Sequence, residues 1–230
     1  MKKILLLLFV YLSFTSLANA GSGTVVNVDG VNINFPPINS LTEAQEELVG
    51  LLNQMQPTGS EIAIAYVTPE DFDRFENYEE PTFTRFVQVI TTLDGKNLSY
   101  SQFKERVSRN KKEYKEIEKT LSKVNEELVN QDTYLSSLSD IELKNVINAM
   151  IPFPAFIDNE NTFAASTLVA REQTINGKTV RTGRIISTIL IHVNKRILNV
   201  AFYSTVSDEI GMPLHDRKVK DWIKSFWKVN

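Results

Sequence analysis

Three consecutive strand patterns near the end of the sequence constrain the fold most. They cover Thr162–Ile175, Val180–Val193 and Arg196–Val206. Asn176-Gly177 separates the first two patterns and Asn194-Lys195 separates the last two, and both are short turns of the kind found in hairpins. Because such short turns join antiparallel neighbours, the sequence predicts an antiparallel meander in this region.

Helix patterns lie on both sides of this meander. The segment Pro213–Lys228 follows it and repeats apolar residues at helical spacing. The longest helix pattern precedes it and runs from Ser99 or Ser101, either of which suits an N-cap, to about Gln131. A shorter helix is predicted over Ile141–Met150. The long pattern carries an apolar seam with heptad spacing, made of Phe103, Val107, Tyr114, Ile117, Leu121, Val124 and Leu128, with Asn110 at its polar position.

The first part of the chain predicts further elements of both kinds. Thr24–Val28 and Val31–Phe35 flank an Asp-Gly turn, which predicts a β-hairpin. Ser40 and Glu43 match a capping box and predict a helix over residues 41–55. Strands are expected at 61–67 and 83–92, with a short helix and loop at 69–81 between them.

This order of elements predicts an α+β fold. Local turns join the strands, and the helices are grouped outside them, so the sheet should be mainly antiparallel with helices packed on one or both faces. The 42% of hydrophobic residues suits a globular chain. Residues 21–230 are long enough to bury one ordinary core, and we expect a single domain.

The first twenty residues match a secretory signal peptide. Lys2 and Lys3 precede an apolar stretch over Ile4–Leu17, and Ala18 and Ala20 are the small residues that signal peptidase recognises. We therefore expect cleavage after Ala20 and export, either to a bacterial periplasm or to the outside of the cell. The chain has no cysteine, which excludes disulfides, a lipoprotein anchor and thiolate chemistry. No later apolar run reaches membrane-spanning length, so the exported chain is expected to be soluble.

The end of the chain resembles the closing β-β-α of PsbP-like proteins. The residues that carry this resemblance are the strands Val180–Val193 and Arg196–Thr205 and the helix that contains Trp222-Ile223 and Phe226-Trp227. The resemblance covers about residues 60–230 and implies an α/β/α sandwich with a non-enzymatic binding or assembly role. The N-terminal hairpin and the long heptad helix depart from that family, and no site residue can be transferred from it.

Charge is distributed unevenly along the sequence. Residues 21–96 hold 12 acidic and 3 basic side chains, whereas residues 151–230 hold 7 acidic and 11 basic ones. Two interpretations remain open: the uneven charge steers a charged partner, or the two segments face each other within one domain. No basic stripe interleaved with aromatic residues is present, so we expect no nucleic-acid binding.

The residues that usually perform catalysis are few. His192 falls on a strand pattern and is expected to be a satisfied sheet histidine. His215 precedes Asp216 at the start of the last helix, where the aspartate offsets the helix dipole and the histidine has no evident role. Asp158–Thr162 resembles a calcium loop but lacks its glycine and its last acidic ligand, so a polar turn is expected. No phosphate-binding glycine loop is present, and no cofactor or metal is predicted.

Two features favour binding. The heptad seam around Tyr114, Ile117 and Leu121 could pack on the predicted 141–150 helix, dock on the sheet, or form a homodimer through residues 99–131. Phe153 and Phe156 lie in a proline-stiffened apolar connector that would mark a partner or ligand site if exposed, or cap the sheet edge if buried. The leading hypothesis is a non-enzymatic binding or assembly protein whose partner is another protein or a small apolar ligand. The alternatives are a hydrolase that uses His192 or His215, and a carrier with a pocket between the sheet and the long helix.

Overall fold

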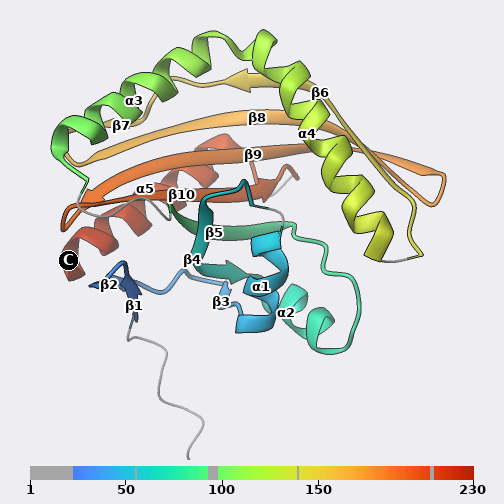
Figure 1. The fold of residues 1–230 in the computed structure, drawn as a ribbon, viewed down its shortest axis with the longest axis horizontal. Coiled ribbons are helices and arrows are strands. Elements are labelled where there is room, and N and C mark those ends of the chain that lie inside the picture. The colour runs from blue at the N-terminus through green and yellow to red at the C-terminus, as the bar shows by residue number, and fades with distance from the viewer. Residues whose placement is uncertain (1–22, 55, 93–97, 139, 208–209) are drawn as a thin grey trace, which may run out of the picture.

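The computed structural model describes residues 23–54, 56–92, 98–138, 140–207 and 210–230. Within these residues it contains a two-stranded hairpin, an eight-stranded sheet and five helices (Figure 1). The strands are β1 (Thr24–Val28), β2 (Val31–Phe35), β3 (Thr42–Glu43), β4 (Ser60–Val67), β5 (Arg85–Thr92), β6 (Leu143–Pro152), β7 (Ile157–Asp158), β8 (Thr162–Ile175), β9 (Lys178–Val193) and β10 (Arg196–Thr205). The helices are α1 (Glu46–Gln54), α2 (Pro69–Glu76), α3 (Tyr100–Lys115), α4 (Ile117–Leu138) and α5 (Met212–Val229).

The large sheet is antiparallel throughout. Its strand order is β3-β4-β5-β10-β9-β8-β6, and the short β7 also pairs with β8. The predicted meander is confirmed as β8, β9 and β10. Its first turn places Asn176 and Gly177 at positive φ, at 47° and 76°, as the short hairpin turn requires. The prediction of an α+β fold with a mainly antiparallel sheet is therefore confirmed.

Helices cover both faces of this sheet, because successive side chains of each strand point to opposite faces. On β9, Ile189 and Ile191 pack with α5 and the β1–β2 hairpin, whereas Leu190 packs with Phe103 of α3 on the other face. Helices α1 and α2 also lie on the α3 face, where they cover β4, β5 and β10. Helix α4 runs beside the edge strand β6, as Figure 1 shows.

The predicted helix over residues 141–150 is wrong, because this segment forms the edge strand β6. Its pairing with β8 extends from Leu143 opposite Ile175 to Pro152 opposite Thr167. Short apolar segments fit both periodicities, and here the β-branched Val146 and Ile147 and the long neighbouring strand favour pairing over a two-turn helix.

Two predicted helix boundaries also need correction. The helix expected after Ser40 begins at Glu46 instead, because residues 42–43 form β3 and pair with β4. Of the two predicted caps, Ser99 is the one used: the long helix begins at Tyr100 behind a capping box of Ser99 and Gln102, but it is interrupted at Glu116. Its second half, α4, continues past the predicted end to Leu138.

The predicted hairpin forms and packs on the α5 face of the sheet. Ile33 and Phe35 are fully buried there, and Phe35 lies against Phe226 with 5.9 Å between the ring centroids. The predicted signal peptide, residues 1–20, lies outside the described residues. Among the residues that are described, none of the helices is long and apolar enough to cross a membrane.

Candidate functional site

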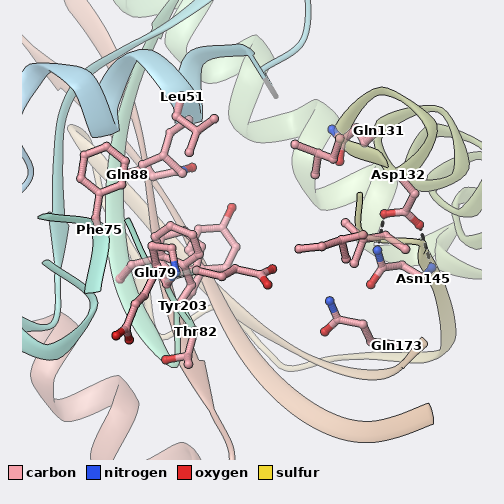
Figure 2. A pocket seen from close by; sticks show the side chains of 18 of the residues that line it. Leu51, Phe75, Glu79, Thr82, Gln88, Gln131, Asp132, Asn145, Gln173 and Tyr203 are labelled. Carbon is pink, nitrogen blue, oxygen red and sulfur yellow. Dashed lines mark hydrogen bonds between the residues drawn. The ribbon is translucent and has the colours of Figure 1, made fainter. Parts of the chain in front are cut away.

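A groove of about 1190 Å³ opens on the face of the sheet that carries α1 to α4. One wall comes from α1, α2 and the α2–β5 loop, and the opposite wall comes from the second half of α4. Figure 2 shows Leu51 and Phe75 on the first side and Gln131 and Asp132 on the second. The space between them is larger than a second hollow, of about 340 Å³, beside α5.

The floor of the groove consists of strand residues that share one face of the sheet. Register pairs join Gln88 to Ala201 and Phe86 to Tyr203, and they join Arg171 on β8 to Thr182 on β9. Floor residues come from five strands, Gln88, Tyr203, Arg184, Arg171, Gln173 and Asn145 among them. Because strand side chains alternate between faces, these residues belong to the face opposite α5.

The α2–β5 loop owes its position to Asp71, which is fully buried. The carboxylate accepts hydrogen bonds from the backbone of Thr82 at 2.7 Å and of Phe83 at 3.0 Å, and from the Thr68 hydroxyl at 2.7 Å. A buried charge is tolerated only when its oxygens are bonded in this way. Asp71 therefore has a structural role, and it holds one wall of the groove against the sheet.

The opposite wall is tied to the floor by Asp132 of α4. Asp132 is 5% exposed and accepts hydrogen bonds from the backbone and the side-chain amide of Asn145 on β6. The Asn145 side-chain oxygen in turn accepts a bond from Arg171. The Nε of Arg171 is buried with no hydrogen-bond partner. This chain of contacts places a guanidinium on the floor with one donor unsatisfied.

A second arginine lies close by on the same floor. Arg184 donates to the carbonyl oxygen of Phe83 at 3.2 Å and lies 5.9 Å from the ring centroid of Phe86. Burial lowers the pKa of Arg184, and the charge of Arg171 lowers it further. Burial also lowers the pKa of Arg171, although nearby Asp132 acts in the opposite direction. The groove therefore contains two partly desolvated positive charges.

The predicted site residues Phe153 and Phe156 lie elsewhere, between β6 and β7. The backbone N–H of Phe153 donates to Ser166 at 2.9 Å and that of Phe156 donates to Ala164 at 2.9 Å, so the connector extends the sheet edge along β8. Phe153 remains 37% exposed. Phe156 is half-buried against the α5 side of the core, where the Lys220 ammonium lies 5.3 Å from its ring centroid. Neither residue lines the groove.

The predicted site residues Tyr114, Ile117 and Leu121 of the seam are half-buried and do not line the groove either. Tyr114 packs on the cluster that contains Phe103 and Val107, which are buried against the sheet. Ile117 and Leu121 fall on the first turns of α4. Only the last seam residue, Leu128, contributes to the groove. The seam therefore docks at least partly within its own chain, and a homodimer through residues 99–131 stays a prediction.

His192 is a satisfied sheet histidine, as predicted. Its Nε2 lies 3.0 Å from the Leu98 carbonyl oxygen, and its ring stacks 5.6 Å from that of Phe103. Asp158–Thr162 forms the predicted polar turn, since the Asn159 side chain accepts bonds from the backbone of Asn161 and Thr162. His192 and Asn159 therefore both serve to hold neighbouring backbone segments in place.

His215, by contrast, has a structural role that the sequence did not reveal. Its Nε2 lies 2.9 Å from the Ser187 hydroxyl and its Nδ1 lies 2.9 Å from the Ser204 hydroxyl. Ser187 contacts Ser166 at 2.6 Å, and Ser166 donates to Asp216 at 2.8 Å. The three serines and His215 are each at most 4% exposed. The ring bonds hydroxyls on both sides and has no carboxylate partner, so the geometry does not support the predicted hydrolase alternative.

Sequence reasoning missed the groove itself. Arg171 and Arg184 lie on two neighbouring strand patterns, Asn145 lies on a segment expected to be helical, and no motif connects them. The sequence offered no clear signal, because the two arginines stand among other polar residues such as Glu172, Gln173 and Arg181.

No protein-family model matches the sequence, and no curated protein is significantly similar to it. Among solved structures, the Ran-binding protein Mog1p of Saccharomyces cerevisiae is similar with a TM-score of 0.37 and 11% sequence identity. The similarity covers 91% of this chain and 95% of Mog1p. A likeness of this size carries no information about function.

Proposed function

We propose that this chain is an exported, non-enzymatic binding protein that receives a segment of a partner protein in the groove between α2 and α4. The observation that carries the proposal is the groove itself, a volume of about 1190 Å³ whose walls combine apolar and polar residues around a polar floor. The signal-peptide pattern supports the location, and the buried, hydroxyl-bonded His215 supports a role without catalysis.

The size of the groove favours a polypeptide over a small molecule. Pockets for small ligands usually enclose about 300–1000 Å³ and surround most of the ligand. This groove is larger and is partly open to solvent. Such a shape suits an extended segment, whose ends must leave the groove toward the rest of the partner.

The chemistry of the lining also favours a polypeptide. Its side-chain amides are distributed over both walls and the floor: Gln45, Gln56, Gln88, Gln131, Asn145 and Gln173. A lipid tail would remove the exposed amides from water and offer them no hydrogen bond, which is costly. A peptide backbone provides a donor and an acceptor at nearly every residue. The carrier alternative is further weakened because Phe103 and Val107, at the start of the long helix, are packed into the core.

Site-specific cross-linking in cells that naturally export the chain tests this function. A photoreactive residue at Leu51 and one at Leu128 place probes on opposite walls. A third at Val180, which is 55% exposed outside the groove, serves as the matched control. We expect the same protein to cross-link to both walls and not to position 180. Equal cross-linking at all three positions, or a lipid as the product at both walls, would contradict the proposal.

A further inference from the structure

Arg171 and Arg184 form a pair of like charges on neighbouring strands of the groove floor. Both side chains lie on the sheet face opposite α5, and each contributes to the lining. Their charges act on each other, since Arg171 lowers the pKa of Arg184. Two partly buried guanidinium groups that repel each other are less favourable in an empty groove than with an anion between them.

Within the described residues, no carboxylate forms an ion pair with either arginine. Across the part of the chain that the structure describes, neither Arg171 nor Arg184 has a carboxylate oxygen within 4.0 Å. Asp132 is nearby, but its two oxygens accept bonds from Asn145. The Nε of Arg171 remains buried and unsatisfied. The arginines bond neutral oxygens, those of Asn145 and of the Phe83 backbone.

The acidic residues at the groove margin have other neighbours. Glu76 accepts a hydrogen bond from Gln45 at 2.8 Å, and Glu79 lies 3.8 Å from the guanidinium of Arg74. Both contacts lie on the α1–α2 side. The margin is therefore acidic and the floor is basic. Such an arrangement favours a ligand whose negative charge lies over the floor and disfavours one whose negative charge lies at the margin.

We infer that the segment bound in the groove carries one aspartate or glutamate whose carboxylate pairs with Arg184 and Arg171 on the floor. Apolar residues on either side of it contact the walls at Leu51 and Phe75 and at Leu128. This inference rests on the proposed function, and it adds the chemistry of the segment. A guanidinium binds a carboxylate through two parallel hydrogen bonds, and here it would do so where little water competes.

Selection from a random dodecapeptide library tests the inference. The library is selected on the exported chain and depleted on a Leu51→Ser/Leu128→Ser variant, which loses one apolar contact from each wall. We expect the retained peptides to share one acidic residue between apolar residues. Changing that residue to Gln or Asn in a retained peptide should weaken binding about tenfold to a hundredfold.

Arginine variants then identify the partner of the carboxylate. Arg184→Gln should remove most of the difference between the acidic and amide peptides, and Arg184→Lys should restore part of it because the charge returns without the forked geometry. Arg181→Gln is the matched control: Arg181 lies on the same strand but is 80% exposed and pairs with Glu172 at 2.8 Å. It should leave the difference unchanged.

The outcomes separate the two proposals. If no peptide is retained on the wild-type chain in preference to the wall variant, the proposed function fails. If peptides are retained without a shared acidic residue, or if Arg184→Gln and Arg181→Gln behave alike, the groove binds segments but the inference about their charge is wrong. Thermal melts of every variant confirm that each one is folded.

Discussion

At the residue scale, the hydrogen bonds around His215 select the tautomer of its neutral ring. Ser166 donates to Asp216, so its oxygen is free to accept from Ser187, which in turn accepts from the histidine. A neutral ring therefore carries its proton on Nε2, and its Nδ1 accepts from Ser204. Burial lowers the pKa of His215 from 6.5 to about 4; Asp216 opposes this shift and Lys218 adds to it.

This lowered pKa predicts that stability falls with acidity. Between pH 6.5 and 4 the unfolded chain binds a proton at His215 that the folded chain does not, so the free energy of unfolding should decrease as the pH falls through this window. The unprotonated ring stabilises the fold by at most about 3 kcal/mol relative to the protonated one. This stabilisation is fully present above pH 6.5 and is lost as the pH falls to 4. Urea unfolding at a series of pH values measures it.

The control for this prediction is a change that removes the titrating ring. His215→Gln keeps an amide that can bond both serines and should flatten the pH dependence. His192→Gln should not, because that ring lies on the opposite face of β9 and bonds the Leu98 carbonyl. Identical pH profiles for wild type and His215→Gln would show that another group is responsible.

At the scale of elements, α4 replaces a missing strand at the edge of the sheet. Asn125 donates to the Ile147 carbonyl oxygen at 3.2 Å and accepts from the Ile147 N–H at 2.7 Å. Asp132 and Ser136 accept from the N–H groups of Asn145 and Leu143. Three side chains of one helix thus satisfy alternate backbone groups of β6, and this protects an edge that would otherwise pair with another chain.

This arrangement predicts a specific loss in an Asn125→Ala variant. Two partly buried backbone groups of Ile147 would lose their partners, which should cost about 1–3 kcal/mol in the free energy of unfolding. Amide hydrogen exchange should become faster at Ile147 in particular. Asn130→Ala is the matched control, because Asn130 lies on the exposed side of the same helix. An equal effect of both changes would mean that helix propensity, not the edge contact, is responsible.

The elements that could be predicted from sequence are those specified by local chemistry. The turn at Asn176-Gly177 and the cap at Ser99 depend on residues within four positions of each other, and both form as expected. The strand β6 and the start of α1 depend on distant partners instead. Residues 42–43 pair with β4, and β6 pairs with β8 and α4, so tertiary contacts override the local pattern.

The candidate site was less predictable for the same reason. Its floor unites Arg171, Arg184 and Tyr203, which three separate strands bring together through their register. Nothing within a short window of sequence reveals that these side chains share one face with Asp132 of a helix. The sequence left open whether Phe153 is exposed or caps the sheet edge. It lies at that edge, 37% exposed and outside the groove.

At the scale of the whole molecule, the hairpin near the start of the described chain is built into the same core as its end. Arg196, at the start of β10, donates to the carbonyl oxygens of Val28 and Asp29. Asn34 donates its backbone N–H to the Asn230 side chain at 3.0 Å, and Asn230 donates back to the Asn34 carbonyl at 2.7 Å. The hairpin therefore covers α5 and one face of the sheet, and its apolar side is occupied within its own chain.

This packing predicts that the hairpin is required for folding and is not an appendage for a partner. Phe35 and Phe226 are both fully buried, so Phe35→Ala should cost about 3–5 kcal/mol through the cavity that it leaves. Val25→Ala, in the same hairpin but 57% exposed, should change stability by no more than about 0.5 kcal/mol. Urea unfolding followed by tryptophan fluorescence reports directly on this contact, because Trp222 lies 5.5 Å from the Phe226 ring. If the two variants were equally stable, the hairpin would contribute little to the core and would be available to pair with another chain.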